Sequence, residues 1–207
     1  MARPFAYAIL AGALLAAPLA APVAALAQPA TDPAAAPAGT WALDKRHASL
    51  TLRVKHFGTS NYTFRLSGLD GSYAYDPANP TASKVSITVD PKSVDTGLPN
   101  FNKEISDDPK FFDSAKYPTI TFVSTKIEQT SPGKGKLTGD LTFRGVTKPV
   151  TLDVTYNGFA KTPFGSQIMG FSAAGKIKRS EFGFTHLVPM VSDDVDLAIE
   201  AEFNPKK

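Results

Sequence analysis

The sequence predicts an all-β protein whose eight antiparallel strands can close into a barrel. Apolar residues recur at every second position almost throughout residues 39–207, the pattern of strands with one buried face. Short Gly- and Pro-containing segments separate the apolar runs, and long helical patterns do not alternate with them. These features favour a meander of hairpins over a parallel α/β sheet, and eight such strands are enough to form a closed barrel.

The strands are predicted in order along the chain. In the first, Ala48, Leu50, Leu52, Val54 and His56 share one face. The second changes the phase of its alternation after Gly68, which indicates a bulge or bend in a long strand. The predicted strands begin near residues 48, 61, 84, 119, 136, 149, 167 and 194.

One long segment interrupts the strand pattern. Residues 91–118 contain five Pro or Gly residues, and the spacing of Leu98, Phe101 and Ile105 is typical of a short helix. We therefore expect a short helical insertion around residues 98–113, ending at the adjacent aromatic pair Phe111 and Phe112.

The first 38 residues differ in composition from the rest, because 17 of them are Ala and 6 are Pro. Residues 1–27 have the form of an export signal: Arg3 precedes an apolar stretch, and the small residues around Leu26 predict cleavage between Ala27 and Gln28. A retained membrane anchor is the alternative, weakened by prolines within the stretch. Residues 28–38 are expected to be a flexible Pro/Ala linker, and residues 39–207 a single domain.

Charge and cysteine content exclude several classes of protein. Without Arg3, the chain carries 21 Lys and Arg against 19 Asp and Glu, and the basic residues are scattered, so no stripe suited to nucleic acid is expected. The absence of Cys excludes disulfides, thiolate metal sites and Cys nucleophiles. An exported chain without disulfides is predicted to be periplasmic.

The inward residues leave two interpretations of the interior open. Ala48, Gly139, Ala173, Gly175 and Ala201 are small, which would leave room for a ligand beside the larger apolar residues. Alternatively, they complement aromatic side chains in a filled barrel or sandwich.

The residues alone do not demand catalysis. His47 and His56 are nine positions apart and would face opposite sides of one regular strand, and no metal-binding spacing occurs, so no metal or cofactor is expected. The chain has no Gly-x-Ser-x-Gly elbow, phosphate-binding loop or dinucleotide fingerprint. We therefore predict a protein that is not an enzyme.

Two polar residues fall on the apolar phase of their strands, namely His56 and Arg179. An inward Arg needs a carboxylate, a carbonyl or a ligand head group, because an unpaired buried charge is costly. It could pair with Asp193, Asp194 or Asp196, or point to water if the strand ends before it. The functional alternative is that His56 and Arg179 form a polar handle at one end of an apolar tunnel.

The order of motifs from Gly39 to Phe203 resembles that of the YceI-like family of bacterial periplasmic proteins. The matching segments are residues 41–44 with His47 and Ser49, then 56–58, 93–96, 111–113, 117–122, 139–150, 179–183 and 191–195. Two segments depart from the family pattern: Gly68 to Gly71, at the entry to a strand, and Leu98 to Asp108, near the expected cavity mouth.

The resemblance implies an extended, lipocalin-like eight-stranded barrel that binds a polyisoprenoid or a similar long-chain amphiphile without established catalysis. The motifs imply a cavity lined by His56, Phe111, Phe112, Phe122, Phe143, Arg179 and Phe182. Phe64 and Ile177, on the apolar faces of their strands, complete the predicted ligand-binding set. The expected ligand is a polyisoprenoid, an isoprenoid quinone or a fatty-acyl amphiphile.

Two further functions remain as alternatives. One is a hydrolase or isomerase acting on such a lipid through His56 with an acid or Arg179. The other is a filled-barrel interaction module in which exposed aromatics such as Phe164 dock a membrane partner. Transient membrane contact and a homodimer are the remaining partner hypotheses, and nucleic acid is not expected.

Overall fold

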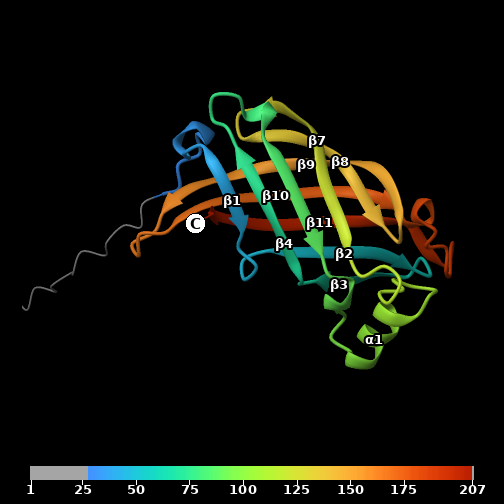
Figure 1. Ribbon diagram of the computed structural model, residues 1–207. Helices are drawn as coiled ribbons and strands as arrows, with labels where there is room; N and C mark the ends of the chain where they lie inside the picture. Colours follow the sequence, from blue (N-terminus) through green and yellow to red (C-terminus); the bar gives the residue numbers. More distant parts are fainter. Residues whose placement is uncertain (1–27, 207) are drawn as a thin grey trace, which may run out of the picture.

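The computed structural model describes residues 28–206 and is built almost entirely of strands (Figure 1). The predicted leader, its cleavage site at Ala27 and Lys207 are not covered by the described residues. The strands are β1 (Gly39–Leu43), β2 (Ser49–His56), β3 (Ser60–Leu66), β4 (Leu69–Tyr75), β5 (Lys84–Val89), β6 (Val94–Asp95), β7 (Ile120–Ser131), β8 (Lys134–Phe143), β9 (Val146–Lys161), β10 (Gln167–Lys178) and β11 (Val191–Pro205). The helix is α1 (Pro99–Asp107), and 3-10 turns lie at η1 (Pro33–Ala35), η2 (Pro80–Ala82), η3 (Pro91–Ser93) and η4 (Arg179–Phe182).

The strands form a closed antiparallel barrel, which confirms the predicted fold class. Eight strands make the ring in the order β1, β4, β5, β7, β8, β9, β10 and β11, and β11 pairs again with β1 through Leu43 and Phe203. The other half of β11 pairs with β2, and β2 pairs with β3, so these two strands extend the wall beyond the ring. Helix α1 packs against β6 and η3 at that extended end (Figure 1).

Two of the long barrel strands are broken in the middle: one into β1 and β2, which both pair with β11, and the other into β3 and β4. The predicted change of phase at Gly68 marks the second break, because β3 pairs with β2 and β4 pairs with β1. A Cβ atom on Gly68 would lie 2.8 Å from the Cβ atom of Ser93, so the close approach of η3 requires glycine there. Strand β1 was not among the predicted strand starts, because its five residues are too few to show an alternation.

Residues 28–38 do not form the flexible linker that their composition predicts. Ala30 forms a bridge with Phe159 of β9, η1 follows it, and the side chain of Ala36 is only 1% exposed. The barrel end supplies backbone hydrogen bonds and an apolar seat for Ala36, and these tertiary contacts order a segment whose Pro/Ala composition carries no strand signal of its own.

Within the described residues, no helix is long and apolar enough to cross a membrane.

Candidate ligand-binding site

The barrel encloses two apolar cavities that adjoin each other and share part of their lining. Residues 29–37 form a strap across one end of the barrel, and we call the cavity between Pro33 of this strap, β4, β5 and β7 to β11 the strap-side chamber; its volume is about 290 Å³. We call the cavity next to α1 the helix-side chamber; its volume is about 430 Å³. Four side chains line both chambers and form the waist: Leu50, Ile120, Leu141 and Leu197. The barrel is therefore hollow rather than filled.

Strand alternation explains which side chains face the chambers. Along β10, the lining residues Met169, Phe171 and Ala173 are two positions apart, as the pleat of a strand requires. The small inward residues have different roles. A Cβ atom on Gly139 would lie 2.4 Å from the ring of Phe122, so that ring fills the space, whereas Ala173 and Ala201 leave room at the strap-side chamber.

Aromatic rings dominate the wall of the helix-side chamber. Phe111 and Phe112 follow α1, and each packs edge-on against Phe184, with ring centroids 6.0 and 6.2 Å apart. Phe112 also packs against Phe143 of β8, at 5.6 Å. Arg144 holds this segment to the barrel by donating hydrogen bonds to the backbone oxygens of Phe111 and Pro109.

Seven of the nine predicted ligand-binding residues line the helix-side chamber. They are His56, Phe64, Phe111, Phe112, Phe143, Ile177 and Arg179. Phe122 lines the strap-side chamber instead. Phe182 is buried in η4 and lines neither chamber; its ring packs against Phe143 at 6.0 Å. The role of these residues in binding stays a prediction.

Arg179 is buried among backbone carbonyl groups. Strand β10 ends at Lys178, yet the Arg179 side chain is only 3% exposed and does not point to water. Its Nε atom donates to Ser192 O at 2.9 Å, one Nη atom to Phe184 O at 3.3 Å and His186 O at 2.7 Å, and the other Nη atom to Val191 O at 2.8 Å.

These bonds use four of the five N–H groups of the guanidinium. Burial lowers the pKa of Arg179, while the charge of Asp193 raises it, and that carboxylate itself accepts hydrogen bonds from Ser180. Arg179 therefore organises the loop from Phe184 to Val191 through carbonyl contacts rather than through a direct ion pair.

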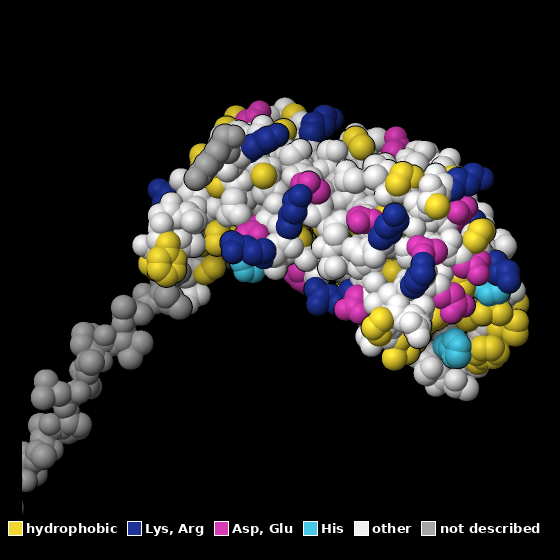
Figure 2. Space-filling model, turned by 60° about the horizontal axis from the view of Figure 1, so that its bottom comes forward, with side chains coloured by type: hydrophobic (Ala, Val, Ile, Leu, Met, Phe, Trp, Pro, Cys, Tyr) yellow, Lys and Arg dark blue, Asp and Glu magenta, His cyan; other side chains and the backbone are white. Residues whose placement is uncertain are grey.

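Two histidines lie at the mouth of the helix-side chamber. His56 ends β2, is exposed, and packs edge-on against Phe57 at 4.6 Å. His186 packs against Phe111 at 5.1 Å, and both histidines line the chamber. The exposed apolar residues Phe57, Leu187 and Met190 lie nearby. Phe57 N donates to Met190 O at 2.7 Å, and Leu187 lines the chamber. Figure 2 shows hydrophobic side chains gathered beside histidines at one end of the molecule.

Two tyrosine hydroxyls are buried without a hydrogen-bond partner among the described residues. They are Tyr62 Oη, whose residue lines the helix-side chamber, and Tyr156 Oη, whose residue lines the strap-side chamber. Burial raises the pKa of Tyr156 to about 12. By contrast, the Oη atom of the neighbouring Tyr75 donates to Pro33 O at 2.7 Å.

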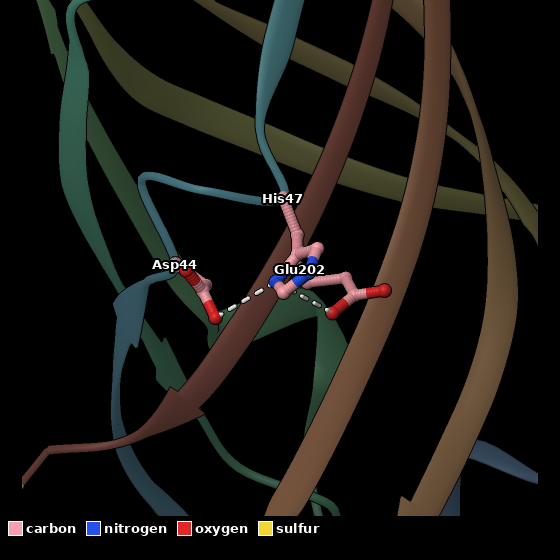
Figure 3. Close-up of side chains that lie close together, drawn as sticks. All are labelled: Asp44, His47 and Glu202. Carbon is pink, nitrogen blue, oxygen red and sulfur yellow. Dashed lines mark hydrogen bonds and ion pairs between the residues drawn. The ribbon is translucent and has the colours of Figure 1, made fainter.

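Asp44, His47 and Glu202 form a polar cluster outside the barrel (Figure 3). One nitrogen of His47 and one carboxylate oxygen of each acidic residue lie within 4.8 Å of one another. His47 Nδ1 lies 3.0 Å from Asp44 Oδ2 and 3.7 Å from Glu202 Oε2. Asp44 also accepts hydrogen bonds from Arg46 N and Asn204 Nδ2. His47 and the other donors lower the pKa of Asp44 to about 2. These contacts join the corner between β1 and β2 to the end of β11.

Sequence reasoning missed several chamber residues. The waist residues Leu50, Leu141 and Leu197 lie on the apolar faces of alternating strand sequences, so alternation could have found them. Phe184 and His186 lie in an irregular loop, where no periodic signal exists. The contribution of Pro33 could not be found, because its Pro/Ala-rich surroundings resemble a linker.

Comparisons with known proteins agree with this architecture. The model of the YceI-like domain family matches residues 41–203. Protein YceI of Escherichia coli O157:H7 is 37% identical over 167 residues, which are 80% of this chain and 86% of that protein. The crystal structure of the Campylobacter jejuni YCEI protein has a TM-score of 0.64 and 37% identity, and the match covers 74% of this chain and 90% of that one.

A more distant structure shares the fold. The polyisoprenoid-binding domain from Saccharophagus degradans, implicated in plant cell wall breakdown, has a TM-score of 0.61 and 14% identity, with 82% of this chain and 100% of that chain covered. At this identity the similarity shows the fold alone. The family match and the identity to the Escherichia coli protein establish that the chain belongs to the YceI-like family.

Proposed function

We propose that the protein is a soluble periplasmic carrier that holds a polyisoprenoid or a similar long-chain amphiphilic lipid inside the barrel. The observation that carries the proposal is the pair of apolar chambers that meet at the waist of Leu50, Ile120, Leu141 and Leu197. Ligand cavities in proteins typically measure about 300–1,000 Å³, and the two chambers lie near or within that range.

The shape and chemistry of the chambers suit a long apolar chain. A chain that passes the waist contacts aliphatic and aromatic walls on both sides, and burial contributes roughly 25 cal/mol for each Å² of apolar surface removed from water. The Saccharophagus degradans domain has this fold and is described as polyisoprenoid-binding, which supports the same ligand class here. A polar head group would lie nearest the histidines at the mouth of the helix-side chamber, where His56 is exposed.

The arrangement favours binding over catalysis. Arg179 directs its donors at backbone carbonyls, so it is poorly placed to polarise a reacting group. The contacts found for the ring of His56 are with Phe57, and no carboxylate among the described residues is hydrogen-bonded to it. A hydrolase or isomerase working through these two residues therefore has no supporting geometry.

The first experiment is organic extraction and mass spectrometry of the exported protein, purified without detergent. We expect a stoichiometric isoprenoid or fatty-acyl species, or stoichiometric uptake of added polyprenol in native mass spectra. The absence of both a co-purifying amphiphile and polyprenol uptake would contradict the proposal.

A variant at the waist tests where the lipid lies. Leu141→Trp should block passage between the chambers and reduce polyprenol uptake at least tenfold. Asp140→Trp is the matched control, because Asp140 is the adjacent residue of β8 and is exposed. Circular dichroism spectra should match for both variants. Equal uptake by Leu141→Trp and the wild type would place the lipid elsewhere.

The periplasmic location has its own test. N-terminal sequencing of the protein from the periplasmic fraction should begin at Gln28, because the small residues before it favour cleavage. An intact N-terminus in the membrane fraction would instead support a retained anchor.

A further inference from the structure

Residues 29–37, which we call the strap, are fastened across one end of the barrel. Ala30 exchanges two backbone hydrogen bonds with Phe159 of β9, at 2.8 and 2.9 Å. Tyr75 of β4 donates to Pro33 O at 2.7 Å, and the indole Nε1 of Trp41 in β1 donates to Pro37 O at 3.3 Å. The strap thus contacts three strands of the ring, and the side chain of its residue Ala36 is buried.

The barrel has a shaped seat for the strap. At Gly158 of β9, a Cβ atom would lie 2.7 Å from the Cβ atom of Pro29 and 3.2 Å from Ala30 O. The backbone angle φ at Gly158 is +134°, which side-chain-bearing residues rarely adopt. Glycine at this position lets the strap approach β9 closely.

The strap also forms part of the cavity wall. Pro33 lines the strap-side chamber together with Tyr75 and Tyr156. The turn η1, which begins at Pro33, lies at the opposite end of the barrel from α1 (Figure 1). The strands around it are held by continuous ladders of hydrogen bonds, whereas the strap is held by four hydrogen bonds and one buried methyl group. Release of the strap would therefore leave the hydrogen-bond ladders of the barrel intact.

We propose that the strap is a movable end wall that sets the longest lipid chain the barrel accepts. This inference rests on the proposed function. A chain that enters from the helix-side chamber and passes the waist advances toward Pro33 as it lengthens. Each additional isoprene unit that is buried raises the affinity of the barrel for the lipid, and further units add nothing once the chain end reaches the strap. Affinity should then stop rising with chain length.

The experiment compares polyprenols of increasing length with the wild type and with Ala36→Arg. An Arg side chain does not fit the buried position of Ala36, so the variant should lift the strap. Ala35→Arg is the matched control, because the adjacent side chain is exposed. Trp41 is the only Trp of the chain and is 1% exposed, so a red shift of its emission in the ligand-free protein reports strap release.

We expect the affinity of the wild type and of Ala35→Arg to reach a plateau at the same chain length. In Ala36→Arg, Trp41 emission should shift to the red, and the polyprenols beyond that plateau should bind at least tenfold more tightly than to the wild type. A released strap with an unchanged length profile would overturn the inference, as would a wild-type affinity that rises without a plateau.

A second variant covers the case in which Ala36→Arg does not fold or does not release the strap. Ala30→Pro removes the donor to Phe159 O and leaves the barrel residues unchanged. It should give the same red shift and the same longer limit, and an unchanged profile would overturn the inference. Failure of every protein to bind any polyprenol would refute the proposed function itself, while strap release would still be visible in Trp41 emission.

Discussion

At the scale of single residues, Arg179 shows how backbone carbonyl groups can stabilise a buried charge that has no direct ion pair. Its guanidinium is surrounded by carbonyl oxygens of the segment from Phe184 to Ser192. Carbonyl dipoles replace the lost water, and the planar fork matches several acceptors at once. The loop at the mouth of the helix-side chamber therefore depends on one side chain.

Replacing this side chain should destabilise the protein strongly. Arg179→Lys keeps the charge but loses the fork, so several buried carbonyls lose their donor, and we expect the free energy of unfolding to fall by about 2–4 kcal/mol in urea titrations. Arg53→Lys is the control, because Arg53 is exposed and pairs with Asp196, an interaction worth less than about 1 kcal/mol. Equal losses in both variants would contradict the structural role.

Removing an unpartnered tyrosine hydroxyl should stabilise the protein, in contrast to replacing Arg179. Tyr156→Phe removes a buried hydroxyl that has no partner, so the ligand-free protein should gain about 1 kcal/mol in the free energy of unfolding. Tyr75→Phe should lose about 1 kcal/mol, because Tyr75 donates to Pro33 O. Thermal and urea unfolding of the two variants measure both signs, and a loss in Tyr156→Phe would show that its hydroxyl is satisfied.

At the scale of elements, the corner between β1 and β2 is joined to β11 by a cluster that responds to pH. His47, and then the backbone N–H of Arg46, lower the pKa of Asp44 from 3.8 to about 2. The folded protein therefore holds the charged carboxylate more strongly than the unfolded chain does. The resulting stability is fully present above pH 4 and is lost as the pH falls toward 2.

Asp44→Asn should reduce this acid sensitivity. We expect the variant to be less stable than the wild type at pH 6, by on the order of 1 kcal/mol, and the difference to shrink between pH 4 and pH 2. Asp140→Asn, at an exposed carboxylate of β8, should leave the pH profile unchanged. A difference that stays constant over this range would exclude Asp44 as its source.

Whether an element could be predicted from the sequence depended on how many residues carried its pattern. The barrel could be predicted because long strands such as β10 repeat the alternation many times. Strand β1 was missed because it has only five residues, and the strap was missed because its docking depends on Gly158 and Phe159, more than a hundred residues away. Tertiary contacts of this kind leave no local pattern.

The candidate site was predictable to a smaller extent. Inward aromatics such as Phe64 and Phe143 follow from alternation, but the division of the cavity at Leu141 depends on how side chains from opposite walls meet. The partners of Arg179 are backbone atoms, which no side-chain pattern encodes.

At the scale of the whole molecule, a ligand held inside the barrel must stabilise the fold. A lipid that binds the folded state alone adds RT ln(1 + [L]/Kd), which is about 2.7 kcal/mol at a free concentration of 100 Kd. We expect the melting temperature to rise with polyprenol concentration in the wild type and to rise much less in Leu141→Trp. A melting temperature independent of polyprenol would contradict internal binding.

The seam of the barrel also determines when the chain can fold. Strand β11 pairs with β1 and β2, which lie at the opposite end of the domain sequence, so the ring cannot close before residues 191–205 have been made. Pairings that span most of the chain form slowly, because a long loop must be closed first. A nascent chain therefore stays open at least until β11 has been made, and an open chain is the form that can be threaded through a narrow pore.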